Sequence, residues 1–467
     1  MAAPTPPIDR EPDLLVIGGG AAGLAAARAG VRRKARTLLV QQGRLGGDCT
    51  FTGCIPSKAL IEAARRGVGF APAMAAAHVA VETIAAREDD AVLAREGVQV
   101  AHGWASFRSP RQVDVDGVTV RCRRIVLASG ARPAVPPVPG LGGLDYLTNE
   151  TVFDLGDAPP SLAVLGGGAV GCELAQAFGR LGVSVTVVEA MPRLLPREEP
   201  ETSEVITSVF AREGIDVRCG AMVERAEALD GKGAVRLHLD GRGALEAGRV
   251  LVATGRDGAT EGMGLEAAGV NTEGGFIVTD DALATNVAGI WAAGDVAGKL
   301  QFTHAADEMG RIAAANALSR RPRRRFRAER IPWVTFTAPE VARVGVSEAE
   351  AVARHGRVAY LPMAEVDRAV TADETDGFVK LVAGPRRGLG HLGGGRLLGA
   401  TVVAARGGEL IAEAALALRT GMFTGRLAQT VHAYPTWSTA MQQAAAQLFV
   451  EVAGRRSRPA RPDGGHP

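Results

Sequence analysis

The chain has 467 residues, of which 46% are hydrophobic and 22% charged, a composition typical of a folded globular protein and not of a disordered one. Its 53 Lys and Arg residues nearly balance 51 Asp and Glu residues, and the net charge of +2 excludes a nucleic-acid binder that works by counterion release. The length predicts roughly three domains. We expect a cytoplasmic protein without a membrane segment, because the sequence has neither a signal peptide nor an apolar run long enough to span a membrane.

The first glycine cluster follows an apolar stretch near the N-terminus. We expect a strand over residues 14–17, a tight turn with Gly18, Gly20 and Gly23, and an Ala-rich helix after it. In this GxGxxG spacing the backbone can approach a pyrophosphate, whose charge faces the N-terminus of the helix. The segment therefore predicts a dinucleotide site.

A second copy of the pattern lies further along the chain. Gly166, Gly168 and Gly171 follow an expected strand over residues 162–165 and precede another helix. A single copy is also compatible with tight packing of a helix on a strand, but two copies predict that the chain binds two dinucleotides.

The residues that end the next strand of each unit indicate which dinucleotides bind. Gln41 and Glu189 each stand 23 residues after the first glycine of their clusters. A carboxylate at this point hydrogen-bonds a ribose 2′-hydroxyl and repels a 2′-phosphate, so Glu189 favours NADH, although Arg193 is close enough in the sequence to leave NADPH open. Gln41 can hydrogen-bond a ribose without a charge, so weaker binding is expected there.

Three further segments resemble strands that close such units. Residues 124–133 and 249–258 are apolar runs that lead to Gly130 and Gly255, and a third run ends directly before Asp295. The Asp295 carboxylate can accept hydrogen bonds from the hydroxyls of a polyol, but a helix N-cap is an equally good interpretation of this residue.

The cysteines divide into a close pair and three single residues. Cys49 and Cys54 precede a helix that is expected to open at residues 56–58, where the helix end and Lys58 both favour a thiolate. With no further Cys or His nearby, a closed zinc site is disfavoured, and a close pair in a cytoplasmic protein predicts redox chemistry. The other three are expected to be core thiols: Cys122, Cys172 and Cys219.

Taken together, these motifs resemble the class I pyridine nucleotide-disulfide oxidoreductases. The segment GGDCTFTGCIPSK is similar to the family's redox-active signature, and the likeness extends through TNVAGIWAAGD and FTHAADEMG to VHAYPTWSTA near the C-terminus. The resemblance implies FAD on the first unit, NAD(P)H on the second, and a homodimer whose C-terminal domain covers the active site of the other copy.

The resemblance also implies a role for each matched residue. Cys54 would be the thiol beside the flavin and Cys49 the interchange thiol that attacks the acceptor. Lys58 would lie near flavin N5, paired with Glu173, and Asp295 would hold the ribitol of FAD. Three more matched positions would border the cofactors: Gly130, Gly255 and His304.

The sequence departs from the family at one catalytic position. Disulfide-reducing members place a His directly before the Pro-Thr of the last motif and a Glu five residues after that His, so that the His acts as a general base. Here these positions hold Tyr434 and Thr439. A tyrosine is a poor base at neutral pH, and His432 could replace it only with a displaced backbone; otherwise it is a structural histidine.

The departure leaves three hypotheses for the reaction. The first is a reductase of a metal ion, a quinone or another small electrophile, similar to mercuric reductases but without their C-terminal cysteine pair, since the last cysteine is Cys219. The second is a disulfide reductase or dihydrolipoamide dehydrogenase with a substitute base, and the third is a redox-sensing flavoprotein with incidental turnover.

The expected architecture is an α/β fold with two Rossmann-like dinucleotide-binding domains and a C-terminal α+β dimerisation domain. Residues 385–399 are expected to form a long hairpin loop. The domain boundaries that we expect are 10–150 for the first part of the FAD domain, 151–278 for the NAD(P) domain, 279–330 for the second part of the FAD domain, 331–455 for the interface domain and 456–467 for a disordered tail.

Overall fold

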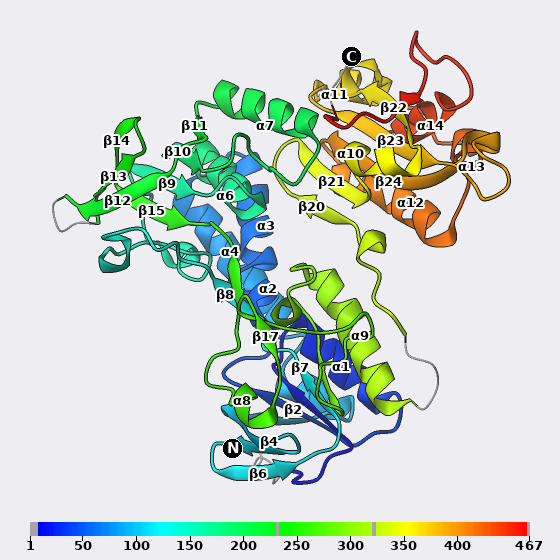
Figure 1. The fold of residues 1–467 in the computed structure, drawn as a ribbon. Coiled ribbons are helices and arrows are strands. Elements are labelled where there is room, and N and C mark those ends of the chain that lie inside the picture. The colour runs from blue at the N-terminus through cyan, green and yellow to red at the C-terminus, as the bar shows by residue number, and fades with distance from the viewer. Residues whose placement is uncertain (1–7, 230–232, 320–323, 465–467) are drawn as a thin grey trace.

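The computed structural model describes residues 8–229, 233–319 and 324–464. In Figure 1 the N-terminal unit, drawn mostly in blue, lies at one end of the molecule, while the green middle unit and the yellow-to-red C-terminal unit lie beside each other at the opposite end. Both views show α3 (Cys54–Arg65) and α4 (Phe70–Ala85) reaching from the first unit to α6 (Ala169–Arg180) of the second. The mixed α/β class is confirmed.

The first unit is built on a five-stranded parallel sheet. Its strand order is β19-β7-β1-β2-β3, and every residue of the central strand is fully or almost fully buried, as its continuous apolar sequence predicts. β19 pairs with β7, so a segment near residue 290 completes a sheet begun near residue 14. The strands are β1 (Leu14–Ile17), β2 (Thr37–Gln41), β3 (Gln99–His102), β7 (Ile125–Leu127) and β19 (Ile290–Ala292).

Small residues bring two helices close together over this sheet. A Cβ atom on Gly310 of α9 (Thr303–Leu318) would lie 2.1 Å from the carbonyl oxygen of Ala22 in α1 (Ala21–Val31), so only glycine allows this approach. The unit also contains α2 (Gly47–Phe51), α5 (Asp90–Arg95), α8 (Leu265–Ala268), the antiparallel strands β4 (Ala105–Ser109), β5 (Gln112–Val115) and β6 (Val118–Arg121), and the hairpin β17 (Thr272–Glu273) and β18 (Phe276–Ile277).

The second unit repeats the parallel design with four strands in the order β11-β10-β9-β15. An antiparallel sheet in the order β12-β13-β14 packs beside it, and a short two-stranded ribbon, β8 (Ala131–Pro133) with β16 (Arg256–Gly258), joins it to the first unit. Its remaining elements are β9 (Ser161–Leu165), β10 (Ser184–Glu189), α7 (Pro200–Arg212), β11 (Asp216–Cys219), β12 (Val223–Ala228), β13 (Val235–Leu239), β14 (Gly243–Ala247) and β15 (Arg249–Val252).

The C-terminal unit is an antiparallel sheet in the order β20-β21-β24-β23-β22-β25, with helices packed against it. Residues 385–395 connect β23 to its antiparallel neighbour β24, as a hairpin does, whereas residues 396–399 of the expected loop already belong to β24. The elements are β20 (Trp333–Thr335), β21 (Glu340–Gly345), α10 (Glu348–Ala351), β22 (Arg357–Pro362), α11 (Asp367–Ala372), β23 (Phe378–Gly384), β24 (Arg396–Ala404), α12 (Gly407–Thr420), α13 (Thr424–Gln429), α14 (Thr439–Ala446) and β25 (Arg458–Pro459).

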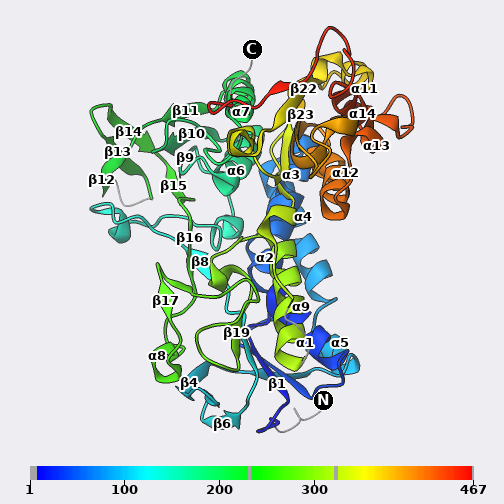
Figure 2. The same cartoon turned by 45° about the vertical axis from the view of Figure 1, so that its right-hand side comes forward.

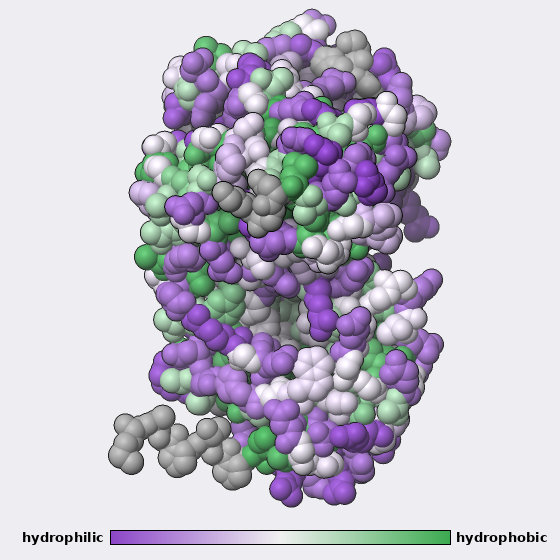
Figure 3. Space-filling model, turned by 90° about the vertical axis from the view of Figure 1, so that its left-hand side faces the viewer, coloured by the Kyte–Doolittle hydropathy of each residue, from purple (hydrophilic) through white to green (hydrophobic). Residues whose placement is uncertain are grey.

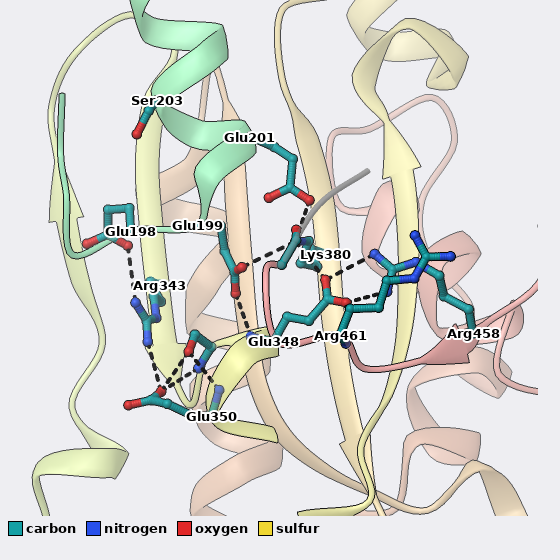
Figure 4. Close-up of polar contacts among 12 residues, drawn as sticks. Glu198, Glu199, Glu201, Ser203, Arg343, Glu348, Glu350, Lys380, Arg458 and Arg461 are labelled. Carbon is teal, nitrogen blue, oxygen red and sulfur yellow. Dashed lines mark hydrogen bonds and ion pairs between the residues drawn. The ribbon is translucent and has the colours of Figure 1, made fainter. Parts of the chain in front are cut away.

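A buried ion cluster joins the second unit to the C-terminal unit (Figure 4). The Nζ atom of Lys380, on β23, lies 2.6 Å from Glu201 Oε1, 3.0 Å from Glu348 Oε2 and 3.2 Å from Glu199 Oε2, and all four side chains are almost completely buried. Glu199 and Glu201 stand at the start of α7, whereas Glu348 begins α10. Three carboxylates around one ammonium group need another cation, and Arg458 supplies it by pairing with Glu348.

The expectation of a disordered tail is wrong for residues 456–464; residues 465–467 lie outside the described residues. Arg458 and its neighbour pair with β22 as strand β25, and the carbonyl oxygen of Gly464 accepts a hydrogen bond from Lys380 at 3.2 Å. The Arg, Pro and Gly composition suggested disorder, but the tail has specific partners in the ion cluster. None of the helices in the described ranges combines the length and apolar character that a membrane-spanning segment requires.

Candidate active site

The first and third glycines of each GxGxxG turn are required by the backbone. Gly18 and Gly166 have φ values of +104° and +107°, and a Cβ atom there would lie 2.2 Å and 2.5 Å from the carbonyl oxygens of Ala128 and Ala253. A Cβ atom on Gly23 or Gly171 would lie less than 2 Å from the carbonyl oxygen of the first glycine of its turn. Each turn therefore packs so closely between two strands and the start of a helix that its first and third positions have no room for a side chain.

The middle glycines face free space instead. A Cβ atom on Gly20 would have one neighbour, at 3.7 Å, and a Cβ atom on Gly168 would have none within 4 Å among the described residues. Both are N-cap residues whose helices, α1 and α6, have no side-chain cap, so the first N–H groups of these helices remain available. The open cradle and the free donors fit the pyrophosphate groups of two dinucleotides. A hollow between the first and second units is visible in Figure 3.

Gln41 and Glu189 occupy equivalent positions beside these turns. Gln41 Oε1 accepts a hydrogen bond from the amide of Gly19 at 2.6 Å, and Glu189 Oε2 accepts one from Gly167 at 2.5 Å. Each side chain therefore lies beside the turn, as its offset in the sequence predicts. Arg193 donates to Ser203 of α7 and to two backbone carbonyl groups of its own loop, so its guanidinium is already bound.

The paired cysteines lie at the junction of two short helices. Cys49 belongs to α2, and Cys54 is the first residue of α3, which places its sulfur at the positive end of a helix as expected. Cys54 Sγ also lies 3.3 Å from the hydroxyl oxygen of Thr303, at the start of α9. Both cysteines are half-buried free thiols. Across the described ranges, no three His, Cys, Asp or Glu side chains gather closely enough to hold a metal ion.

The two thiols of the pair have very different acidities. A hydrogen bond with Cys49, together with the Thr303 hydroxyl and the charge of Lys58, lowers the pKa of Cys54 to about 6 against the opposing effect of burial. The same hydrogen bond raises the pKa of the Cys49 thiol, and burial raises it further. In the dithiol form Cys54 is therefore the thiolate and Cys49 keeps its proton.

Lys58 is held in place by a buried carboxylate. Its Nζ atom lies 2.7 Å from Glu173 Oε2, and Glu173 is only 5% exposed. The other oxygen of Glu173 accepts a hydrogen bond from the amide of Phe336, whose ring lies 4.7 Å below the ammonium group. Because α3 and α6 carry the two charges, this contact also connects the first and second units next to Cys54.

A second set of charges surrounds Asp295. Arg256 pairs with Asp48, the neighbour of Cys49, and its Nε atom lies 3.7 Å from Asp295 Oδ2. Burial, with a smaller contribution from the charges of Asp48 and Cys54, raises the pKa of Asp295 to about 6 against the opposing effect of Arg256. Gly294, not Asp295, is the N-cap of the short 3₁₀ helix that follows, and this helix has no side-chain cap. The residue therefore does not have the capping role that was left open.

Several polar atoms in this region have no hydrogen-bond partner among the described residues. They include Ser129 Oγ, just after β7, Gln301 Nε2, just before α9, and Arg256 Nε. Buried polar groups are normally hydrogen-bonded, so these atoms fit a polar group such as the flavin and ribitol of FAD. Within the described part of the chain, a Cβ atom on Gly130, whose φ is +81°, would meet nothing within 4 Å, and one on Gly255 would have a single neighbour at 3.9 Å.

Sequence reasoning missed Thr303, Asp48 and Arg256 as members of the site. Arg256 directly follows Gly255 in the chain, and Thr303 precedes the residue that was chosen instead, His304. The imidazole of His304 contacts the carbonyl oxygen of Pro332 and stacks on Phe302. These contacts direct it toward the segment that enters the C-terminal unit.

Tyr434 is not brought to the cysteine pair within one chain. It lies on the C-terminal unit, is 74% exposed, and donates a hydrogen bond from its hydroxyl to Asp367 Oδ2 at 2.7 Å. His432 is oriented differently: its side chain is only 7% exposed, with Nε2 3.1 Å from Glu413 Oε1 and Nδ1 2.9 Å from the carbonyl oxygen of Thr430. It therefore has the contacts of a structural histidine.

Comparisons with known proteins agree with this geometry. Residues 12–310 match the family described as pyridine nucleotide-disulphide oxidoreductase, and residues 331–445 match its dimerisation domain. A mercuric reductase of Streptomyces lividans is 37% identical, with 94% of this chain and 97% of the relative covered. A dihydrolipoyl dehydrogenase of Thermus scotoductus is 34% identical, with 94% and 98% covered.

Two solved structures are similar over almost the whole chain. The Cu(II) complex of the HOCl-induced flavoprotein disulfide reductase RclA from Escherichia coli has a TM-score of 0.85 and 28% identity, covering 94% of this chain and 99% of its own. LpdA from Mycobacterium tuberculosis has a TM-score of 0.83 and 29% identity, covering 94% and 100%.

Proposed function

The chain belongs to the pyridine nucleotide-disulphide oxidoreductase family, whose members use FAD and NAD(P)H, and on this premise we propose that its Cys49–Cys54 pair reduces a metal ion or another small electrophile. The observation that carries the proposal is the position of Cys54, at the start of α3 and 3.3 Å from the Thr303 hydroxyl, with a pKa lowered by Cys49 beside it. Such a pair is the reduced form of a redox-active disulfide.

The cysteine pair and the residues around it have separate roles in the proposed reaction. Bound FAD would supply the hydride chemistry that connects NAD(P)H to the disulfide. Two electrons and one proton convert the Cys49–Cys54 disulfide to a thiol and a thiolate, and Thr303 and Lys58 stabilise the negative charge on Cys54. One Hg(II) ion would take both electrons, or two Cu(II) ions would take one each. The metal is reduced, the S–S bond forms again, and the proton of Cys49 is released.

The contacts around Tyr434 and His432 support an acceptor that needs no general base. The hydrogen bond to Asp367 and its charge raise the pKa of Tyr434, so even less phenolate is present at neutral pH to act as a base than in a free tyrosine. His432 is buried against Glu413 and would need a new orientation to serve. Oxidation of dihydrolipoamide, the second candidate reaction, depends on a base, so metal reduction is favoured.

Two of the relatives point to the same substrate class. The Streptomyces protein is named for mercuric reduction, and the Escherichia coli protein was solved with Cu(II). We therefore propose Hg(II) and Cu(II) as the first acceptors to test. NADH is the proposed electron donor, because Glu189 lies beside the second turn and Arg193 is bound elsewhere.

We also propose that the chain works as a homodimer through its C-terminal unit. The match to a dimerisation domain supports this, as do exposed apolar residues on the same unit as Tyr434, among them Val431 at 91% and Leu416 at 58% exposed. Such a dimer would place Tyr434 of one copy near the cysteine pair of the other.

The test measures NADH oxidation by the purified holoenzyme with Hg(II), Cu(II), lipoamide, glutathione disulfide and a quinone as separate acceptors. We expect turnover with the metal ions and its loss in Cys54→Ser, while the matched control Cys219→Ser retains activity. Efficient turnover of lipoamide would favour the disulfide reductase instead. Negligible turnover with every acceptor would favour a redox sensor and contradict the proposal.

A further inference from the structure

Trp333 lies at a point where the three units of the chain meet. Its ring stacks on Phe302, directly before α9 of the first unit, with the ring centres 6.1 Å apart and the ring planes at 7°. Its indole Nε1 donates a hydrogen bond to Glu198 Oε1 of the second unit at 2.7 Å. Trp333 itself begins β20, and the guanidinium of Arg343, on the next strand of the C-terminal unit, lies 5.1 Å from the centre of the ring. One side chain thus contacts all three units.

Both neighbours of Thr303 are held at this junction. Phe302 stacks on Trp333 and also on the imidazole of His304, whose ring centre is 5.8 Å away. The Nε2 atom of His304 contacts the carbonyl oxygen of the residue directly before Trp333. The residues on either side of Thr303 are therefore fixed to the same two positions of the chain, while the Thr303 hydroxyl oxygen lies 3.3 Å from Cys54 Sγ.

The indole ring of Trp333 is itself held from two directions. Arg343 is only 6% exposed, donates a hydrogen bond to the carbonyl oxygen of Arg197 at 2.7 Å and lies 3.2 Å from Glu350 Oε2. Glu198 bonds the edge of the indole through one oxygen, and its other oxygen lies 3.7 Å from Arg343 Nη1 (Figure 4). Buried groups that are tied into such a network are hard to displace. The ring therefore gives the first unit a fixed surface to pack on.

The start of α9 depends on this surface more than most helix starts do. Thr303 is the first residue of the helix, and its N-cap, Phe302, makes no side-chain capping bond. Helix ends fray easily, and a threonine hydroxyl can turn away from its partner when the backbone below it moves. A stacked ring on the N-cap residue takes over the fixing role of the missing capping bond.

We propose that Trp333 is a positioning residue for the redox pair: by stacking on Phe302 it keeps the Thr303 hydroxyl against Cys54 Sγ. Trp333 touches neither cysteine and acts through Thr303 alone. The inference goes beyond the proposed function, because it concerns the neighbour of the Cys54 sulfur and holds for whichever acceptor the pair reduces.

The test uses the holoenzyme reduced by two electrons, without an acceptor. Its long-wavelength absorbance arises when a Cys54 thiolate lies against the flavin, so it follows the placing of the sulfur and its partners and not folding alone. Trp333→Leu should lose at least about half of this absorbance, because a hydrogen bond to a charged group changes an equilibrium by about tenfold or more. Trp333→Phe keeps a ring for the stack and should retain most of it. The matched control is Trp104→Leu, which removes a tryptophan that is 36% exposed and bonded to the carbonyl oxygen of Gly262, and it should leave the absorbance unchanged.

A double substitution shows whether Trp333 acts through Thr303. Thr303→Val removes the hydroxyl directly and should lose a similar part of the absorbance, and adding Trp333→Leu to it should cause no further loss. Phe302→Leu removes the middle ring but leaves the contacts of Trp333 with Glu198 and Arg343. It should lose the absorbance as Trp333→Leu does, and it replaces that variant if the loss of the indole prevents folding.

The outcomes are distinct from those for the proposed function. Additive losses in the double variant would show that Trp333 acts by another route and would overturn the inference. Full absorbance in both Trp333→Leu and Phe302→Leu would overturn it too, as would a parent protein that shows no such absorbance. Turnover with Hg(II) or Cu(II) decides the proposed function separately, because no acceptor is present in this experiment.

Discussion

Removing the Cys49 thiol tests the central claim that its hydrogen bond makes Cys54 a thiolate. The pKa of Cys54 is lowered to about 6, and the contact with Cys49 is the largest cause. At pH 7 a thiol with this pKa is about nine-tenths ionised. Cys49→Ala leaves the hydroxyl of Thr303, the charge of Lys58 and the start of α3 to oppose burial. We expect the pKa of Cys54 to rise above neutrality, so that less than half of it is thiolate at pH 7.

The measurement is the rate of alkylation by iodoacetamide as a function of pH, since only the thiolate reacts. The dithiol form of the parent protein should show a midpoint near pH 6, and Cys49→Ala should show one above pH 7. A protein without either thiol, Cys49→Ala with Cys54→Ala, supplies the background, and Cys219→Ala is the control for loss of a remote thiol. A midpoint that stays near pH 6 in Cys49→Ala would refute the assignment.

Three further predictions concern other contacts of the structure. Thr303→Val should raise the alkylation midpoint of Cys54 by less than the loss of Cys49 does, whereas Thr303→Ser should restore it. Lys380→Met should lower the free energy of unfolding by about 3–5 kcal/mol at pH 7, because it leaves buried carboxylates without their cation, as urea denaturation can measure. This loss in the free energy of unfolding should shrink as the pH falls toward the ordinary glutamate pKa of about 4.3, because the carboxylates become neutral. The exposed control Lys34→Met should show no such loss. Asp295→Asn should stabilise the flavin-free protein by about 2–3 kcal/mol at pH 8, because a carboxyl group whose pKa is raised to about 6 destabilises the fold once it ionises. This gain in the free energy of unfolding should be lost below the ordinary aspartate pKa of about 3.9. An equal gain at pH 8 and below pH 3.9 would contradict the prediction.

The parts of the fold that were predictable are those with a local cause. A strand, a GxGxxG turn and a helix constrain one another within about twenty residues, so both turns could be read from the sequence. The same holds for Cys54 at the start of α3, because good helix formers follow it directly. The likeness to a known family then supplied the return of β19 to the first sheet.

The missed contacts join residues far apart in the chain. Thr303 is 249 residues from Cys54, and Arg256 is 208 residues from Asp48, so no local pattern indicates them. The tail was predicted to be disordered from its composition alone. Its order depends on the carboxylate of Glu348 and on the edge of β22, and neither is visible until the sheet is assembled.

The position of the tail has a consequence for biosynthesis. β22 would be an edge strand of its sheet without β25, and an open edge with unpaired N–H and C=O groups invites pairing with other chains. The groups that close this edge and complete the Lys380 cluster, from Arg458 to Gly464, are translated after every residue they contact. Until residues 458–464 have been translated, the C-terminal unit therefore has an open edge, and its buried carboxylates lack their second cation. A nascent chain that stops short of these residues therefore offers β22 as an edge on which another chain can pair.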